Sequence, residues 1–354
     1  GTMGSGTQSE SRRGFGFRMS AAELRRVNTY RKACGKSPLT HSPGLEFLKY
    51  GKDNHWTSDT FLEQVENLMD CFDVLHPDWQ LCFEVDHSMN HAKSRRNALN
   101  AHNFNKGFGG KQGKEVPHAS FIDPAHANEM LGPHKMTVSG VEVERPLKPG
   151  DVQYFAFRES DSPPWYAPNT PKYDLVDAEG AVVKKGYVNK HKGWQQVIWE
   201  RGLWKDGMQA RLSEDCEEDV DLSLSAFHVL SQCWDFIHEP TALMERVRAR
   251  GHILLMGVKC HPELAGVGIE NSWGKSALYF RRHNDCSTKN LHANVLASLD
   301  SNKNLPLKTI RKFARKTREY LRVYAGHFAD ARTHAAVERL RRKFKCHRGS
   351  IDFD

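Results

Sequence analysis

The stretch Leu81-Cys-Phe-Glu-Val-Asp-His-Ser-Met-Asn-His91 predicts a short strand that ends at an acidic residue. Leu81, Phe83 and Val85 alternate with polar residues, which is the pattern of a strand with one apolar face. Asp86 follows directly at the carboxyl end of this strand. Ligand sites of open α/β sheets lie outside the carboxyl ends of strands, so Asp86 is the first candidate for chemistry.

The residues that precede this strand predict a second strand and a helix. Residues 45–50 are expected to form a short strand. Thr57 or Ser58 can cap a helix that runs to about Leu75 and ends at His76-Pro77. The order strand, helix, strand indicates an α/β fold, although it suits many such folds. The apolar stripe of the helix is expected at Phe61, Val65, Leu68, Met69 and Phe72.

A second motif follows far downstream, His261-Pro-Glu-Leu-Ala-Gly-Val-Gly-Ile-Glu-Asn-Ser-Trp-Gly274. Residues 251–256 are almost entirely apolar and predict a short strand that leads toward it. Glu270 stands 184 residues after Asp86. An Asp at the end of a strand and a Glu that opens a helix are common in α/β proteins, so the neighbours of both acids matter.

Those neighbours resemble the last two acidic motifs of the DDE superfamily endonucleases, which include the Tc1/mariner and IS630-like transposases. The family's second motif is an apolar strand followed by Asp-Asn-x-x-x-His, and residues 86–91 are similar, with His87 in place of Asn. The third motif reads Pro-(Asp/Glu)-Leu-Asn-Pro-Ile-Glu-x-x-Trp-Gly. The positions that fit it are Pro262, Glu263, Leu264, Ile269, Glu270, Trp273 and Gly274.

The resemblance spans roughly residues 45 to 348, and two features depart from it. The stretch Ala265-Gly-Val-Gly268 is longer than the usual Asn-Pro, and no Asp precedes Asp53. In the family the first carboxylate lies on the opening strand of an RNase H-like sheet, two strands ahead of the helix that begins here near Trp56. Either Asp53 or Asp59 takes its place, or the chain is truncated relative to a complete transposase. We favour truncation, or a decayed or domesticated copy.

The resemblance implies metal-dependent cleavage and strand transfer of phosphodiesters, with two Mg²⁺ or Mn²⁺ ions held by carboxylates. Asp86 would bridge both ions and Glu270 would hold one. With only two carboxylates, metal should bind weakly. His87 and His91 are expected to orient Asp86, to contact phosphate or to cap the loop after the strand. We assign no ligand role to Glu84, which should face away from the apolar side of its strand, or to Glu263, which we expect to be a solvated loop residue.

Positive charge is concentrated near the C-terminal end. From Lys275 to Arg348 there are nineteen Lys or Arg and five Asp or Glu, a net charge of +14, whereas the remainder carries −6. This pattern is typical of a surface that binds nucleic acid through its phosphates, without sequence specificity. A solvated basic face is the ordinary alternative. We expect DNA contacts from Lys275, Arg281, Arg282, Lys308, Arg311, Lys312, Arg315 and Lys316.

Much of this charge falls on a helix expected to begin behind Pro306. Basic residues occupy most of its circumference, and one apolar stripe should pack on the rest of the protein. The residues of that stripe are Leu307, Ile310, Phe313, Ala314, Thr317, Leu321 and Tyr324.

The predicted fold is α/β, with an RNase H-like mixed sheet that is incomplete at its N-terminal strands. Residues 1–40 form a flexible basic segment, and residues 41–100 form the first part of the core. Residues 101–192, rich in Gly and Pro, are an insertion of loops and hairpins. Residues 193–275 complete the core, and residues 276–354 form a basic helical region.

Two functions remain open at this point. The first is a transposase-derived DDE-type nuclease that acts on DNA, and the second is a catalytically inactive DNA-binding protein, domesticated or truncated. No run of eighteen apolar residues predicts a membrane span. We expect a nuclear or otherwise intracellular protein with DNA as its partner, and the sequence leaves open whether it is a homodimer.

Overall fold

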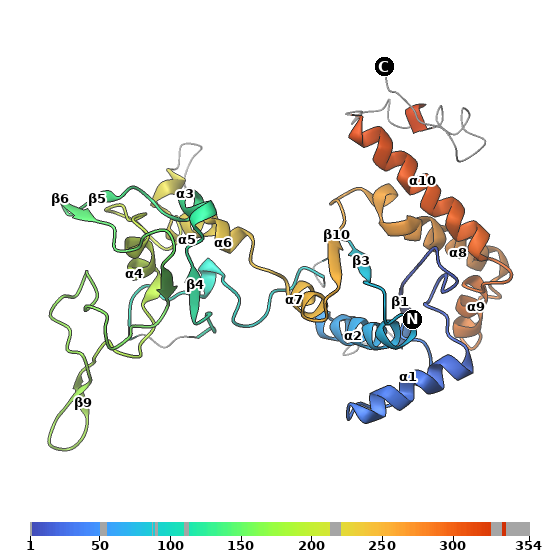
Figure 1. Cartoon of the computed structure of the whole chain (residues 1–354), viewed down its shortest axis with the longest axis horizontal. Helices are drawn as coiled ribbons and strands as arrows, with labels where there is room; N and C mark the ends of the chain where they lie inside the picture. Colours follow the sequence, from blue (N-terminus) through green and yellow to red (C-terminus); the bar gives the residue numbers. More distant parts are fainter. Residues whose placement is uncertain are drawn as a thin grey trace. The chain divides into compact units, whose positions relative to one another are not determined.

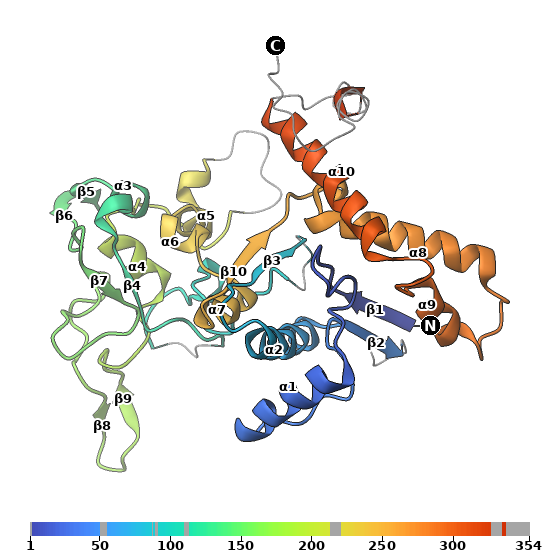
Figure 2. The same ribbon diagram turned by 45° about the vertical axis from the view of Figure 1, so that its right-hand side comes forward.

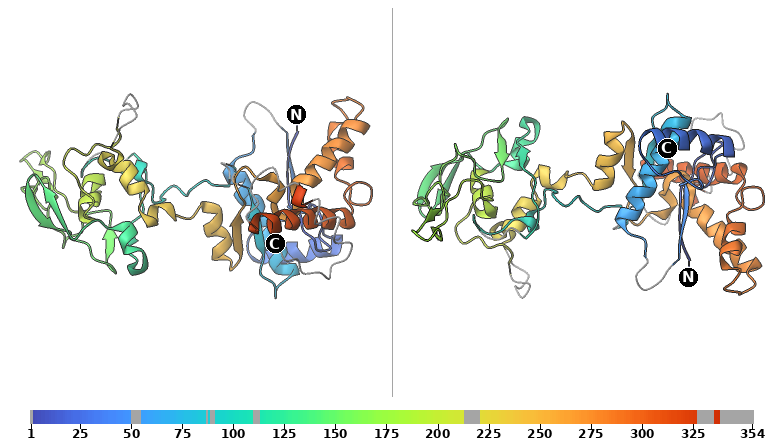
Figure 3. Two further views of the ribbon diagram at one scale, coloured as in Figure 1. Left: turned by 90° about the horizontal axis from the view of Figure 1, so that it is seen from above. Right: turned by 90° about the horizontal axis from the view of Figure 1, so that it is seen from below.

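The computed structural model describes residues 2–49, 55–86, 88, 91–109, 113–212, 221–326 and 335–337, and its fold is α/β. The chain divides into two compact units (Figure 1). Unit 1 combines Gly1–Lys93 with Thr241–Asp354, and unit 2 is Ser94–Pro240. The chain therefore passes between the units twice (Figure 3). None of the helices in the described ranges is long and apolar enough to cross a membrane.

The centre of unit 1 is a parallel pair of strands, β3 (Cys82–Val85) and β10 (Ile253–Met256), with Val85 opposite Met256. Helices α2 (Ser58–Leu75) and α7 (Ala242–Ala249) cover one face of this pair. Phe83 and Val85 are buried there, against the predicted stripe of α2, all five residues of which are buried. The other face stays open, since Cys82, Glu84, Ile253 and Leu255 are exposed.

Local signals set the ends of α2 as predicted. The Thr57 hydroxyl accepts a hydrogen bond from the Thr60 amide, which caps the first turn, and the helix ends at His76. The strand expected at residues 45–50 is β2 (Leu45–Lys49), which pairs in antiparallel fashion with β1 (Thr2–Gly6). In the described part of unit 1, the β1–β2 and β3–β10 pairs are separate two-stranded ladders.

Helix α1 (Ala21–Ala33) is joined to α2 by a buried ion cluster. Arg31 lies 2.6 Å from the carboxylate of Asp70, which is fully buried in α2. Lys36 and Arg250 reach the same carboxylate at 2.8 and 2.7 Å. A buried carboxylate requires such compensation, so this cluster fixes α1 and the end of α7 onto α2.

The C-terminal part of unit 1 is helical. Two short 3₁₀ turns, η4 (Pro262–Leu264) and η5 (Gly266–Gly268), lead into α8 (Ile269–His283). Helix α9 (Leu291–Ser298) follows, and α10 (Leu307–Ala325) then packs back on α8 and both turns (Figure 2). The predicted helix behind Pro306 is confirmed. Of its expected stripe, Ile310, Ala314 and Thr317 are buried, whereas Leu321 is exposed.

Unit 2 consists of short hairpins and short helices around an aromatic core. Strand β4 (Ala119–Phe121) pairs with β7 (Val152–Tyr154), β5 (Lys135–Val138) with β6 (Val141–Glu144), and β8 (Leu175–Val176) with β9 (Val182–Lys184). The helices are η1 (Ala101–Asn103), η2 (Pro124–His126), α3 (Ala127–Met130), α4 (Gly193–Glu200), η3 (Leu222–Leu224), α5 (Ala226–Ser231) and α6 (Trp234–Ile237).

Trp194, Val197 and Ile198 of α4 are fully buried with Phe155 in the core of unit 2. The loops and hairpins expected in residues 101–192 are present. Residues 193–240 were expected in the second part of the core, but they belong to unit 2 because α4 and α5 pack against its hairpins.

Candidate acidic site and basic helix

Asp86 lies at the carboxyl end of β3, and 63% of its side chain is exposed. The Ser88 amide donates a hydrogen bond to its Oδ1 at 3.0 Å. His91 Nδ1 lies 2.6 Å from the same oxygen, and the His91 ring packs on Phe61 with 4.2 Å between the centroids. The same nitrogen lies 3.1 Å from the Asp86 backbone carbonyl, so these contacts fit both the orientation of Asp86 and the capping of the loop after the strand. His87 lies outside the described residues.

Glu270 is the second residue of α8 and is exposed. A carboxylate in the first turn interacts favourably with the positive end of the helix dipole. In the part of the chain that the structure describes, no ion pair or hydrogen bond engages its side chain, which is therefore free for an external ligand. In that same part, no three His, Cys, Asp or Glu side chains gather into a metal centre.

Glu84 shares with Asp86 the open face of β3, as its alternation with Phe83 and Val85 predicted. Its carboxylate lies against two glycines that precede Glu270. A Cβ on Gly266 would be 2.8 Å from Glu84 Oε2, and one on Gly257 would be 3.9 Å from Oε1. Partial burial raises the pKa of Glu84. No sequence pattern indicates this contact of Glu84, because only the fold brings Gly266 to it.

Asp59, one of the two acids considered as replacements for the first carboxylate of the DDE motifs, makes no contact with Asp86 among the described residues. Asp59 is exposed in the first turn of α2, 3.3 Å from Lys93 Nζ. Asp53 lies outside the described residues. Among the described residues, Glu84 lies on the same face of β3 as Asp86.

The stretch Ala265–Gly268, which is longer than the Asn-Pro of the motif it resembles, forms a tight turn. Val267 and Gly268 take left-handed conformations, with φ of 46° and 72°. Gly268 lies so close to α10 that a Cβ would approach the Phe313 carbonyl carbon to 2.6 Å. Gln8 Nε2 donates to the Val267 carbonyl at 2.7 Å. Helix α10 and the N-terminal loop therefore fix the turn from which Glu270 emerges.

Glu263 corrects our expectation of a solvated loop residue. Its Oε1 accepts a hydrogen bond from the Tyr324 hydroxyl at 2.7 Å and lies 2.8 Å from His261 Nδ1. Burial alone would raise the pKa of Glu263, but the hydrogen bonds of His261 and Tyr324 outweigh it and lower that pKa. A solvated residue would lack these partners, which come from α10 and from the same motif.

The expected DNA-binding residues lie on α8 and α10 of unit 1. Arg281 and Arg282 are exposed at the end of α8, and Lys275 and Lys316 are partly exposed. Lys308, Arg311, Lys312 and Arg315 are exposed on α10. Arg318 forms an ion pair with Glu10 at 2.5 Å, and Arg311 Nε donates to the Glu10 carbonyl at 3.2 Å. The N-terminal loop therefore already contacts part of the basic surface.

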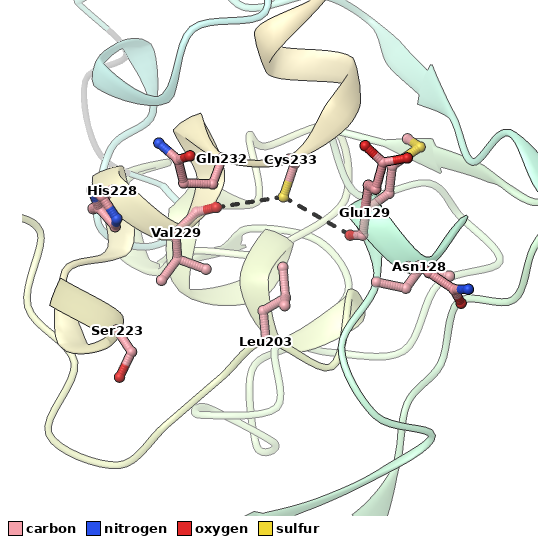
Figure 4. Close-up of a pocket in the computed structure, with 10 residues that line it drawn as sticks. Asn128, Glu129, Leu203, Ser223, His228, Val229, Gln232 and Cys233 are labelled. Carbon is pink, nitrogen blue, oxygen red and sulfur yellow. Dashed lines mark hydrogen bonds between the residues drawn. The ribbon is translucent and has the colours of Figure 1, made fainter. Parts of the chain in front are cut away.

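Unit 2 contains a shallow pocket of about 280 Å³ between α3 and α5 (Figure 4). Leu203, Val229 and Met130 give it an apolar lining, and Gln232 and His228 stand beside them. Burial raises the pKa of the Cys233 thiol, which donates to the Val229 carbonyl. A buried neutral thiol is a poor nucleophile, so we assign no catalytic role to Cys233.

Comparison of the chain with protein-family models, with curated proteins and with solved structures finds no match. The resemblance to DDE endonucleases therefore rests on the two motifs themselves.

Proposed function

We propose that the chain is a transposase-derived, DDE-type nuclease module with an RNase H-like core. The observation that carries the proposal is the pairing of β3 and β10. These strands are parallel neighbours, β3 ends at Asp86, and β10 leads through η4 and η5 to Glu270 in α8. Both candidate acids therefore follow strands of one parallel pair, and the carboxyl ends of parallel strands are where α/β sheets place their sites.

The donor chemistry fits Mg²⁺ or Mn²⁺, which prefer carboxylate oxygens and retain several waters. Asp86 and Glu270 would hold the ions. When bound, they neutralise charge on the attacking and leaving oxygens of a phosphodiester. His91 orients the Asp86 carboxylate. We assign Glu84 as the carboxylate that takes over from the missing first acid, because it lies on the same strand face as Asp86.

DNA is the proposed substrate, because the third motif and the basic helix belong to one packed assembly. The apolar stripe of α10 contacts Leu264, Ile269 and Trp273 of that motif. On its other faces Lys308, Lys312 and Arg315 are exposed to phosphate, whereas Arg318 is already paired with Glu10. A nuclear or otherwise intracellular location is proposed to go with this substrate.

A second candidate function is DNA binding without cleavage. It is favoured by the absence of a three-donor metal cluster among the described side chains. It predicts salt-dependent binding to DNA that needs no divalent ion, since phosphate contacts release counterions whether or not a metal is present.

Nicking of supercoiled plasmid in Mg²⁺ and in Mn²⁺ separates the two functions. We expect activity in the wild type and its loss in Asp86→Asn, Glu270→Gln and Glu84→Gln, with DNA binding retained. Asp59→Asn removes the other described candidate acid, and Asp78→Asn removes an exposed acid in the turn after α2. Both should stay active.

Full activity in Glu270→Gln would eliminate the catalytic assignment. Loss in Asp59→Asn, but not in Glu84→Gln, would transfer the third ligand role to Asp59. Binding by a wild type that never nicks would establish the second function.

A further inference from the structure

The third motif is attached to the basic helix by a polar contact at one end. Glu263 in η4 accepts the hydrogen bond of Tyr324, near the C-terminal end of α10, and His261 lies 3.4 Å from the same hydroxyl. The His261 and Tyr324 rings also meet edge to face, with centroids 5.4 Å apart. The hydrogen bond to Glu263 raises the pKa of Tyr324 to about 12, so the phenol remains a donor across the physiological range.

Apolar packing and a backbone contact complete this attachment. Leu264 is buried against Tyr320 and Val323. Both residues lie within about one helical turn of Tyr324. Five residues after Glu263, Gly268 abuts the Phe313 backbone. Both ends of the segment Glu263–Gly268 are thus fixed to α10, and this segment runs directly into Glu270.

The position of Glu270 therefore depends on its backbone. Its side chain makes no hydrogen bond or ion pair within the described residues, so nothing but the preceding turn and its helix sets where the carboxylate lies. A charge-assisted hydrogen bond such as Tyr324 to Glu263 is stronger and more directional than a neutral one. It therefore holds the start of the segment that leads to Glu270, while Gln8 and the Phe313 backbone hold its end.

We propose that Glu263 and Tyr324 are positioning residues, which couple occupation of the basic α10 surface by DNA phosphates to the segment that places Glu270. This inference rests on the proposed function, since it takes DNA as the ligand of α10. Phosphate binding that orders α10 would order residues 263–270 through this contact. Positioning of a catalytic carboxylate through a surrounding shell of this kind is expected to affect the reaction strongly.

Hydrogen exchange, measured with and without a short duplex DNA, tests the coupling independently of nuclease activity. In the wild type, DNA should slow the exchange of amides in residues 263–272 by about fivefold or more, the range of ordinary coupling between sites. Tyr324→Phe keeps the ring and its packing but removes the hydroxyl. We expect it to lose this protection, while its affinity for DNA stays the same because no cation is removed.

Two matched variants sharpen the test. Tyr279→Phe removes a phenol hydroxyl from α8. Because the Tyr279 ring stacks on His283 and not on the third motif, this variant should keep the DNA-induced protection of residues 263–272. Glu263→Gln keeps an acceptor for Tyr324 and should keep more protection than Glu263→Ala. If Glu263 and Tyr324 had a merely structural role, the variants would not differ in DNA-induced protection in this way while their DNA affinity stayed constant.

The outcomes separate the inference from the function beneath it. If Tyr324→Phe binds DNA and shows the protection of the wild type, the coupling is overturned and the proposed function stands. If the wild type binds no duplex DNA at low salt, both are overturned. In that case the unliganded proteins still report whether Tyr324 holds the turn.

Discussion

Arg201 is a fully buried cation at the centre of unit 2, in the stretch Glu200-Arg-Gly-Leu-Trp204. Its guanidinium forms two hydrogen bonds with Asp235, at 2.9 and 2.6 Å, and a third with Gln153 at 2.8 Å. Burial alone would raise the pKa of Asp235, but Arg201 overcomes this effect and lowers it. Each charge of this buried pair is therefore compensated only while both Arg201 and Asp235 are present.

Arg201→Met should destabilise the protein by about 3–5 kcal/mol, because it leaves the buried Asp235 charge without compensation. Lys135→Met is the control: Lys135 pairs with Glu142 on the surface, and its loss should cost less than about 1 kcal/mol. Urea unfolding curves give both values. Similar costs for the two variants would contradict this account of the buried pair.

The pH dependence of that difference has a definite sign. Because the pKa of Asp235 is lowered in the folded wild type, its contribution to stability is present above the ordinary Asp pKa of about 4. It is lost as the pH falls through the lowered pKa. The gap between Arg201→Met and the wild type should therefore narrow in acid.

The sequence predicts some residues of the candidate site and misses others. Asp86 and Glu270 were singled out by their neighbours, and His91 by its place in the motif. Glu84 and Glu263 were set aside, because their partners, Gly266 and Tyr324, come from distant parts of the chain. No local sequence pattern predicts contacts between residues so far apart in the chain.

At the scale of elements, the start of α8 depends on the handedness of one residue. Gly268 caps the helix with φ of 72°, and α10 leaves no space for a side chain there. Gly274, in the same helix, has open space around the position of its missing Cβ. Backbone conformation and packing therefore require glycine at position 268, whereas neither requires it at position 274.

Gly268→Ala should destabilise the protein by about 1–3 kcal/mol from the left-handed backbone alone, with the clash against Phe313 in addition. Gly274→Ala should stabilise it by up to about 1 kcal/mol, because Ala is the better helix former. Thermal melting of the two variants should shift in opposite directions. A neutral Gly268→Ala would mean that α10 does not press on the turn.

Helix periodicity predicted α2 almost completely and α10 in part. Thr57, the stripe from Phe61 to Phe72 and the stop at His76 are all local signals, and the structure confirms them. In α10 the buried stripe shifts from Leu321 to Tyr320 and Val323. Leu264 packs on those two residues, and this tertiary contact decides which side of the last turns faces inward.

At the scale of the whole molecule, unit 1 carries both the candidate acids and the described part of the basic surface. If α10 binds DNA phosphates, each cation that contacts a phosphate contributes about one unit to the slope of log affinity against log salt. Cations that are already neutralised within the protein should contribute less. Arg318, paired with Glu10, is such a cation, whereas Lys312 is exposed and forms no ion pair with a carboxylate of the described residues.

Lys312→Gln should therefore lower the salt slope of DNA binding by about 1, and Arg318→Gln should lower it less. Lys148→Gln, an exposed lysine of unit 2, should leave the slope unchanged. Fluorescence anisotropy at a series of salt concentrations measures all three. Equal slopes in all variants would remove α10 from the DNA-binding surface.

The sequence by itself determined the α/β class and the positions of α2, β3, β10 and α10, because caps, alternation and helical periodicity are local. Asp86 and Glu270 stay predictions that rest on their motifs. Only the tertiary structure decided that residues 193–240 belong with the hairpins of unit 2 and that Glu84 faces Gly266. It also decided that Tyr324 reaches Glu263. These outcomes depend on which surfaces meet, and the free energy of burying one surface against another is set by residues far apart in the chain.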